Sequence, residues 1–329
     1  MITIHDIQIF VMTYNRSALL QETIQSLLAQ TIQPTHITVL DNSSPDNTED
    51  VVKSFASEGV HYVRTTGFLG NFNKARKLVS KPYCMLFHDD DLLHPSYLET
   101  ALKMLNHYSN LSLITCAYTP FNHGTPPDIP TNLSTEHIIF TSPRDWACYM
   151  YFFEGISYAP AIYRTKDFLQ TELEYEKFNK FNDWPFLVKM GAHGNVGFLT
   201  DSHSIFARQH PAQDSNNENN FPNLEQIVNW DKCFFSLMNI SSRKDLLYWI
   251  YGAYNAHFLL GKYNAAPKAL RAKHSINDLK QAVKKAGLPT FGLGNIHLLK
   301  KYIFNSLTRK LRRKLRKLVR QDFKNVSNQ

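Results

Sequence analysis

Short runs of apolar residues alternate with stretches of helical periodicity over roughly the first 115 residues of the chain. The apolar runs predict β-strands at residues 7–12, 37–40, 60–63, 83–88 and 111–118. Between them, apolar residues at helical spacing predict helices near residues 17–28, 51–55, 71–79 and 96–107. Strand and helix signals that alternate at this spacing are typical of a parallel sheet with right-handed crossover connections. We therefore expect an α/β fold for this part of the chain.

The pattern changes beyond residue 118. Residues 119–165 are rich in proline and aromatic residues and show no clear period. A helix is expected at residues 185–192, followed by strands at 198–199 and 204–208 that look paired with each other. A polar stretch then predicts a mobile loop, after which helical periodicity resumes at residues 224–238, 243–260 and 276–286. We therefore expect a domain at residues 1–210, a mobile loop at 211–223 and a helical C-terminal region at 224–329.

The composition is that of a globular protein with room for one large domain and a smaller appendage: 329 residues, 43% hydrophobic and 19% charged. Its four widely spaced cysteines predict buried thiols in a reducing compartment, and not a disulfide framework or a zinc site. We find no basic region followed by an apolar stretch at the N-terminus, and no window of about 18 uninterrupted apolar residues. We therefore expect neither a signal peptide nor a transmembrane helix, and a cytoplasmic location.

The net charge of +8 comes from one segment near the C-terminus. Residues 300–324 carry 11 Lys and Arg residues and one acidic residue, whereas the rest of the chain carries 25 basic and 27 acidic residues. A basic amphipathic helix is typical of a membrane-surface element, while nucleic-acid binding and a solvated helix packed on the domain are alternatives. The helix is predicted because these apolar residues recur between the cations at helical spacing: Ile303, Phe304, Leu307, Leu311, Leu315, Leu318 and Val319.

Polar residues follow three of the predicted strands, at residues 13–16, 41–44 and 89–91. The carboxyl ends of parallel strands line the ligand crevice of such a sheet, so the three clusters are candidates for one binding site. The last of them is the aspartate triplet, which consists of Asp89, Asp90 and Asp91 and directly follows an apolar run.

The aspartate triplet has two interpretations. Like charges at the end of a buried strand repel one another and resist desolvation. A divalent cation such as Mg²⁺ or Mn²⁺ with a bound pyrophosphate would offset them, because these ions prefer carboxylate oxygen. The alternative is a solvated acidic turn that caps the helix beginning near Pro95 and Ser96. The other two polar clusters favour the metal site.

Four segments carry a resemblance to a known family. They are residues 10–16 (FVMTYNR), 40–48 (LDNSSPDNT), 70–76 (GNFNKAR) and 87–91 (FHDDD). In their order and spacing, the chain resembles the GT-A glycosyltransferases, specifically the family-2 group of bacterial sugar transferases, over roughly residues 5–210. The resemblance implies the GT-A fold, which is a Rossmann-like α/β fold with a mostly parallel central sheet and flanking helices. It also implies a nucleotide-sugar donor that lies across the strand ends.

The resemblance assigns roles to the polar residues after the first two strands. Thr13, Asn15 and Arg16 would lie at the nucleotide. Asp41 would accept hydrogen bonds from the base or the ribose.

The family pattern also assigns the aspartate triplet. Asp89 would meet the ribose or the sugar, and Asp91 would bind the Mn²⁺ or Mg²⁺ ion that bridges the two phosphates. Asp90 would orient Arg76 or the sugar, and both Arg76 and Asn71 would belong to the donor site. A cation on both phosphates stabilises the negative charge that develops on the leaving nucleoside diphosphate.

An inverting transfer needs a carboxylate that takes the proton of the acceptor hydroxyl. The family places an acidic pair at the start of a helix after the acceptor region, and this chain has Asn182 and Asp183 there. Asp183 is therefore the candidate base, although the first acid of the pair is missing. Its alternative role is that of a helix cap or first-turn acid stabilised by the helix dipole.

The sequence Arg208-Gln209-His210 resembles a family signature, Arg-x-His before a polar loop. It implies that His210 ligates the metal or contacts the pyrophosphate and that Arg208 belongs to the donor site. The loop at residues 211–223 would then be a lid that donor binding orders. His88 and His203 receive no role, although His88 adjoins the predicted metal site.

The function that follows is an inverting, metal-dependent glycosyltransferase, hexosyl or N-acetylhexosaminyl, that extends a bacterial surface glycan such as lipooligosaccharide, capsule or a glycoprotein glycan. Because such acceptors are often lipid-linked, we favour an anionic membrane as the partner of the basic helix, at the inner face of the cytoplasmic membrane, and expect no nucleic acid. One alternative is a nucleotidyltransferase that makes nucleotide sugars, but the glycine-rich loop expected after its first strand is absent. The other is a non-catalytic protein that binds nucleotide sugars.

Overall fold

The computed structural model describes residues 1–67, 69–152, 156–211, 213, 222–240, 248, 251–252, 255 and 275–289. The chain divides into two compact units. The sheet unit comprises Met1–Thr141, Gly155–Glu172 and Met190–Pro211, and the helical unit comprises Ser142–Glu154, Leu173–Lys189 and Ala212–Gln329. Two segments of the expected domain at residues 1–210, Ser142–Glu154 and Leu173–Lys189, thus belong to the same unit as the C-terminal region. We describe each unit by itself.

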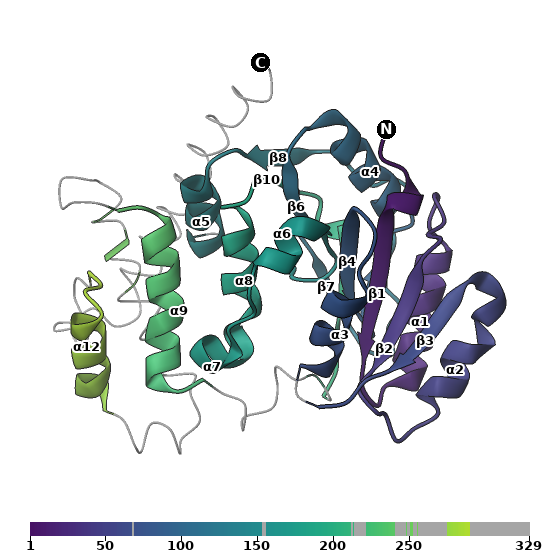
Figure 1. Cartoon of the computed structure of the whole chain (residues 1–329), viewed down its shortest axis with the longest axis horizontal. Helices are drawn as coiled ribbons and strands as arrows, with labels where there is room; N and C mark the ends of the chain where they lie inside the picture. Colours follow the sequence, from purple (N-terminus) through teal and green to yellow (C-terminus); the bar gives the residue numbers. More distant parts are fainter. Residues whose placement is uncertain are drawn as a thin grey trace. The chain divides into compact units, whose positions relative to one another are not determined.

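An eight-stranded sheet forms the centre of the sheet unit (Figure 1), in the order β3-β2-β1-β4-β9-β6-β10-β8. Strands β1 to β4 are parallel to one another, β6 is parallel to β10, and β9 and β8 run antiparallel to their neighbours. The α/β fold expected from the sequence, with a mostly parallel sheet, is therefore confirmed. The strands are β1 (Ile7–Thr13), β2 (Ile37–Asp41), β3 (Val60–Arg64), β4 (Tyr83–His88), β6 (Leu111–Cys116), β8 (His137–Phe140), β9 (Ala161–Arg164) and β10 (Asn195–Leu199).

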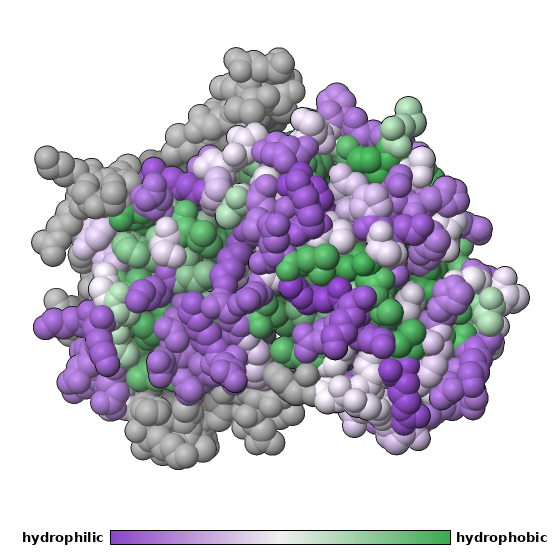
Figure 2. Space-filling model, viewed as in Figure 1, coloured by the Kyte–Doolittle hydropathy of each residue, from purple (hydrophilic) through white to green (hydrophobic). Residues whose placement is uncertain are grey.

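The helices that connect the parallel strands pack on the sheet through their apolar faces. In the first of them, Leu20, Ile24 and Leu27 are fully buried in the same core as Val11 and Phe87 of the strands. Hydrophilic side chains form much of the described surface in the view of Figure 2, as expected when the apolar residues are gathered in a core. The helices of this unit are α1 (Ser17–Leu28), α2 (Thr48–Ser54), α3 (Gly70–Leu78), α4 (Tyr97–His107) and α6 (Thr165–Gln170), with short 3₁₀ turns at Ile4–Asp6, Ala56–Glu58 and Ser202–Ser204.

A second, three-stranded sheet joins distant parts of the sheet unit. Strand β11 (Ile205–Gln209) pairs antiparallel with β5 (Leu92–Leu93) and parallel with β7 (Thr119–Asn122). The predicted pairing of residues 198–199 with 204–208 is wrong, because β10 lies between β6 and β8 in the large sheet while β11 belongs to the small one. The small sheet brings residues 208–210 to the aspartate triplet, which immediately precedes β5.

The helical unit contains α5 (Pro143–Phe152), α7 (Tyr175–Phe178), α8 (Asp183–Met190, grouped here through Lys189), α9 (Leu224–Leu237) and α12 (Ile276–Lys285), with a 3₁₀ turn at Asn179–Phe181. Helices α5, α7 and α12 pack against α9. Both α9 and α12 begin with capping boxes, in which Asn223 pairs with Gln226 and Ser275 with Asp278.

Several predictions from the sequence lie mainly or wholly outside the described residues. Those residues include only part of the predicted helix at 243–260 and of the predicted lid at 211–223, and none of the basic amphipathic helix at 300–324. Among the described residues, no helix is both long enough and apolar enough to cross a membrane.

A buried carboxyl group lies in the core of the helical unit. Asp231 on α9 is fully buried, and its Oδ1 accepts a hydrogen bond of 2.6 Å from the hydroxyl of Tyr151. Its Oδ2 has no hydrogen-bond partner among the described residues. Burial, opposed by hydrogen bonds from Tyr151, Tyr251 and Asn255, raises the pKa of Asp231 to about 7. The folded protein therefore holds a proton on Asp231 at pH values where the unfolded chain has released it.

We predict that Asp231 makes the protein less stable as the pH rises from 4 to 7. Because the pKa of Asp231 is higher in the folded than in the unfolded state, its contribution is complete below pH 4 and is lost as the pH passes 7. Asp231→Asn mimics the protonated acid and should remove this loss. Thermal melting should give equal Tm values for the two proteins near pH 3.5, below the pKa of Asp231 in the unfolded chain, and a variant Tm higher by roughly 4 °C or more at pH 8. A variant whose Tm falls with pH as steeply as that of the wild type would contradict the assignment.

Candidate active site

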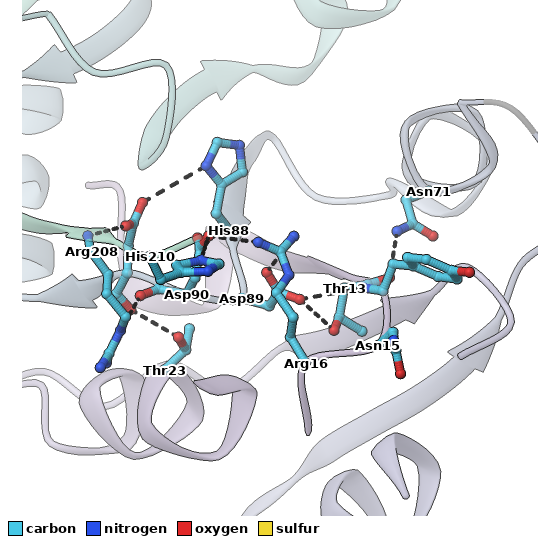
Figure 3. Close-up of polar contacts among 12 residues, drawn as sticks. Thr13, Asn15, Arg16, Thr23, Asn71, His88, Asp89, Asp90, Arg208 and His210 are labelled. Atoms are coloured by element: carbon cyan, nitrogen blue, oxygen red, sulfur yellow. Dashed lines mark hydrogen bonds and ion pairs between the residues drawn. The ribbon is translucent and has the colours of Figure 1, made fainter. Parts of the chain in front are cut away.

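Three strands end side by side at one edge of the large sheet, and the polar clusters follow them. The register of the central strands pairs Thr13 of β1 with Asp41 of β2, and Met12 of β1 with His88 of β4. The residues that follow these strands are therefore brought together, as the parallel topology predicts. Figure 3 shows the resulting network of polar contacts.

The turn after β1 holds the first carboxylate of the aspartate triplet. Asp89 is fully buried, and its Oδ2 accepts hydrogen bonds from the Thr13 hydroxyl at 2.6 Å and the Tyr14 amide at 3.3 Å. The guanidinium of Arg16 lies 3.1 Å from Oδ1 of Asp89 and donates to Oδ2 of Asp90 at 2.6 Å. One cation thus compensates two adjacent carboxylates.

Burial and charge act in opposite directions on these groups. Burial and the charge of Asp90 outweigh Arg16 and raise the pKa of Asp89 to about 6. Burial also favours the neutral form of Asp90, but the cations His88 and Arg16 and the hydrogen bond with His210 outweigh it and lower the pKa. Burial lowers the pKa of His88, but its contact with Asp91 and the charges of the triplet outweigh burial and raise that pKa to about 9. The cluster therefore keeps negative charge at neutral pH and attracts cations.

Arg208 of β11 fixes the triplet from the side of the small sheet. Its backbone amide donates to Oδ1 of Asp91 at 2.9 Å, and its Nε donates to the carbonyl of Asp90 at 2.8 Å. Its Nη2 donates to Glu22 of α1 at 2.6 Å, and its guanidinium lies 4.7 Å from the ring centroid of Phe121. Arg208 was expected in the donor site, and in this structure its described contacts orient Asp90 and Asp91.

His210 lies next to the same carboxylates. It is buried, and its Nε2 lies 3.0 Å from Oδ2 of Asp90. The sequence predicts that His210 ligates a metal together with Asp91. In the structure, the described contact of His210 with the triplet is made with Asp90.

A group of side chains with the composition of a metal site lies here. Among the described residues, His88, Asp90 and Asp91 each offer one ligand atom, and these three atoms lie within 4.8 Å of one another. The two carboxylate oxygens suit Mn²⁺ or Mg²⁺, ions that keep open positions for phosphate oxygens, and the imidazole nitrogen favours a transition-metal ion such as Mn²⁺ over Mg²⁺. The donor set therefore fits a divalent cation of this kind.

The neighbouring strand end, that of β2, is built around Asp41, which is almost fully buried. Its Oδ1 accepts from the amide of Ser44 at 3.0 Å and from its hydroxyl at 2.5 Å, and its Oδ2 accepts from the hydroxyl of Tyr62 at 2.7 Å. Burial and the hydrogen bond to Asp41 raise the pKa of Tyr62. The amide of Asn15 donates to the Ser44 hydroxyl at 2.7 Å, so the turns after β1 and β2 are tied together.

The start of α3 closes against these turns. Asn71 donates through Nδ2 to the carbonyl of Thr13 at 3.1 Å, and its Oδ1 accepts from the hydroxyl of Thr65 at 2.5 Å. A Cβ atom at Gly70 would lie 3.1 Å from Oδ1 of Asn42 and 3.3 Å from the Thr65 hydroxyl. Glycine therefore permits the close approach of α3 to β2 that places Asn71 at the strand ends.

Two of the expected residues make their described contacts elsewhere in the chain. Arg76 donates to the carbonyls of Phe168, Leu169 and Thr171, so it caps the C-terminal end of α6, where a cation is favoured by the helix dipole. Asp183 belongs to the helical unit as the first residue of α8, and its Oδ1 accepts from the amide of Trp184 at 2.9 Å. Both assignments to the donor site and to the base remain predictions.

The structure adds residues that the sequence analysis did not select. Glu22, Ser44 and Tyr62 are the hydrogen-bond partners of Arg208 and Asp41, and His88 is a member of the metal-ligand group. His88 lies inside one of the quoted motifs and was detectable there. Glu22 and Tyr62 are a helix residue and a strand residue without a local signal, so only the fold reveals their role.

Comparisons with known proteins identify related sequences and structures. Residues 8–168 match the family model described as "Glycosyl transferase family 2". An uncharacterised glycosyltransferase of Rickettsia typhi is 29% identical over 114 residues, which cover 34% of this chain and 36% of that protein. A second, from Rickettsia prowazekii, is 28% identical over 114 residues with the same shares of the two chains. The match thus spans about a third of the length of these curated relatives.

Solved structures share the fold. Residues 1–349 of S. aureus TarS in complex with UDP-GlcNAc superpose with a TM-score of 0.57 and 16% identity, over 86% of this chain and 83% of that chain. The same protein in complex with UDP gives a TM-score of 0.54 and 16% identity, over 90% and 92%. Together with the strand order, these matches confirm the resemblance seen in the sequence: the chain has a GT-A fold, and its residues 8–168 match glycosyl transferase family 2.

Proposed function

We propose that this protein transfers a sugar, with inversion, from a nucleoside diphosphate donor to a hydroxyl of a bacterial surface glycan in a metal-dependent reaction. The observation that carries the proposal is the joining of the three polar strand ends into one network that contains the buried aspartate triplet. The resemblance to family 2 assigns the donor to these strand ends.

The residues at the strand ends suit a diphosphate. In the proposal, Asp91 and His210 hold the cation with the help of Asp90, and the cation, when bound, supplies positive charge to the leaving diphosphate. Asp41, fixed by Ser44 and Tyr62, provides a rigid wall for the base or ribose. Such rigidity lowers the entropic cost of binding, because the pocket is ordered before the donor arrives.

The base of the reaction is Asp183 in this proposal. Its support is its place in the sequence, at the start of a helix after the acceptor region, and its place at the first residue of α8. Asn182, which stands where the family has its first acid, is buried, and its side-chain amide has no hydrogen-bond partner among the described residues. The chain therefore offers one carboxylate at this position, and it would take the proton from the acceptor hydroxyl.

The donor and acceptor classes follow from the same proposal. TarS, which shares the fold, has been seen with UDP-GlcNAc, and we extend to this chain a uridine diphosphate donor of a hexose or an N-acetylhexosamine. The acceptor is a glycan of the lipooligosaccharide, capsule or glycoprotein type, and a lipid-linked acceptor would place the enzyme at the inner face of the cytoplasmic membrane.

We predict that one nucleoside diphosphate stabilises the protein only with metal present. In a thermal-shift screen of UDP, GDP, CDP and ADP, with and without Mn²⁺ or Mg²⁺, we expect UDP with metal to raise the Tm by at least roughly 2 °C, because ligands that bind the folded state stabilise it. Asp91→Asn should lose the metal-dependent part of the shift, and Asp50→Asn, which replaces an exposed first-turn acid of α2, should keep it. The absence of any shift with all four nucleotides would count against the proposal.

We predict that Asp183→Asn abolishes turnover and leaves donor binding intact. Removing a general base typically lowers the rate by roughly 10²–10⁴-fold, whereas the nucleotide-dependent Tm shift should be unchanged. Asp145→Asn, at an exposed first-turn acid of α5, is the matched control and should retain activity. Equal activity of the Asp183 variant and the wild type would assign the base elsewhere.

We predict that the basic segment at residues 300–324 binds anionic membranes. A chain ending at Asn295 should lose sedimentation with phosphatidylglycerol vesicles, while the full chain should sediment with them at low salt and less at 0.5 M NaCl, since each cation near an anionic surface contributes roughly 1 kcal/mol. Equal binding of both chains to vesicles, or a preference of the full chain for RNA over vesicles, would argue against a membrane role.

A further inference from the structure

We propose that His88 is a direct ligand of the divalent cation, so that the metal site consists of His88 and Asp91 with help from Asp90 and His210. The inference rests on the proposed metal-dependent function and adds a ligand to it. His88 lies outside the Asp-x-Asp and Arg-x-His patterns from which the other metal ligands were predicted.

The position of His88 follows from strand geometry. It is the last residue of β4, next to Phe87, which is fully buried in the core. Because successive side chains of a strand point to opposite faces, His88 points away from that core. Its side chain is 43% exposed, so it is open to an ion and its ligands. The ring is held by Tyr158, whose ring centroid lies 6.1 Å away at an interplanar angle of 31°.

The distance between His88 and Asp91 fits two ligands of one ion. Nδ1 of His88 lies 3.8 Å from Oδ2 of Asp91, which is too far for a hydrogen bond. Two ligands that are each about 2.1 Å from the same ion lie roughly 3.0 Å apart at right angles and roughly 4.2 Å apart on opposite sides. The observed separation falls between these values, so an ion fits between the two atoms with little movement.

The other contacts of Asp91 aim its Oδ2 at this position. Oδ1 of Asp91 accepts from the backbone amide of Arg208 at 2.9 Å, and the carbonyl of Asp91 accepts from Thr23 at 2.9 Å. Both contacts hold Asp91 from α1 and the small sheet, and its Oδ2 lies 3.8 Å from Nδ1 of His88. Carboxylates that ligate metal ions are typically oriented by hydrogen bonds from surrounding residues, as Asp91 is by the amide of Arg208.

Asp90 completes the group on the other side. Its Oδ2 accepts from Arg16 at 2.6 Å and lies 3.0 Å from Nε2 of His210. His210 is therefore engaged with a carboxylate in this structure, whereas His88 and Asp91 face each other without a hydrogen bond. Of the two histidines, His88 is already positioned as a ligand.

The competing role for His88 is that of a positively charged partner of Asp91, and the two roles predict opposite effects. If His88 ligates the ion, its removal weakens metal binding. If His88 acts as a cation at this position, its removal takes away a repulsive charge and strengthens metal binding.

The test measures Mn²⁺ binding directly, without turnover. We expect free-Mn²⁺ EPR titrations of the full-length protein to give a Kd at least roughly tenfold higher for His88→Ala than for the wild type. His203→Ala is the matched control, because His203 also faces an aspartate, Asp201, and is 44% exposed. Its Kd should be unchanged. An unchanged or lower Kd for His88→Ala would overturn the proposal.

A spectroscopic measurement separates His88 from His210. In His210→Ala loaded with Mn²⁺, electron spin echo envelope modulation should still show coupling to a directly bound ¹⁴N nucleus, and His88→Ala in the same background should abolish it. Loss of the coupling in His210→Ala alone would assign the nitrogen to His210 and refute the role of His88. If the wild-type protein binds no Mn²⁺ at all, with or without UDP, it is the proposed metal dependence that fails.

Discussion

The negative charge of three consecutive buried aspartates is the constraint around which the sheet unit is arranged. Carboxylates in this setting repel one another and lose hydration, so the fold must bring cations and amide donors to them. Arg16 provides a cation from the turn after β1, and Arg208 provides an amide and a guanidinium from β11. Glu22 in turn balances the charge of Arg208. The fold thus compensates the triplet by means of contacts from two separate elements, the turn after β1 and strand β11.

The negative charge of the triplet is not fully compensated by these contacts, and the remaining charge favours the binding of a cation. Arg16 contacts both Asp89 and Asp90, while among the described residues the carboxylate of Asp91 is contacted by a backbone amide and the half-exposed His88. The carboxylate farthest along the triplet is therefore the one that gains most from an added cation. A scaffold that satisfied all three carboxylates internally would have no affinity for a metal, whereas one that satisfied none would be unstable.

Much of the fold could be predicted from the sequence, because the relevant signals are local. The apolar runs that became β1, β2, β3, β4 and β6 differ from the observed strands by at most two residues at either end, and the helices between them show a clear period. Residues 119–165 gave no such signal, although they form β7, β8, α5 and β9. Strand β9 joins β4 and β6 at the centre of the sheet, but its four residues are too few for a reliable pattern.

The site divides in the same way. Thr13, Asn15, Asp41 and the triplet were found because they directly follow strands, and the topology then brings them together. Arg76 lies in a matching motif, yet its guanidinium caps α6. This contact could not be predicted, because a family motif does not reveal which of several nearby acceptors a long side chain reaches. Tyr62 and Glu22 could not be found at all, since a buried hydroxyl or a helix-surface acid has no distinctive neighbours in sequence.

The small sheet has a consequence for how the protein is made. Arg208 and His210 reach the triplet across separations of 117 to 120 residues. At ordinary rates of synthesis, the aspartates leave the ribosome on the order of ten seconds before these partners do. During that interval Arg16 and His88 are already present, whereas Arg208 and His210 have still to be made. The final arrangement of Asp90 and Asp91 is therefore completed late in the synthesis of the sheet unit, when β11 is made.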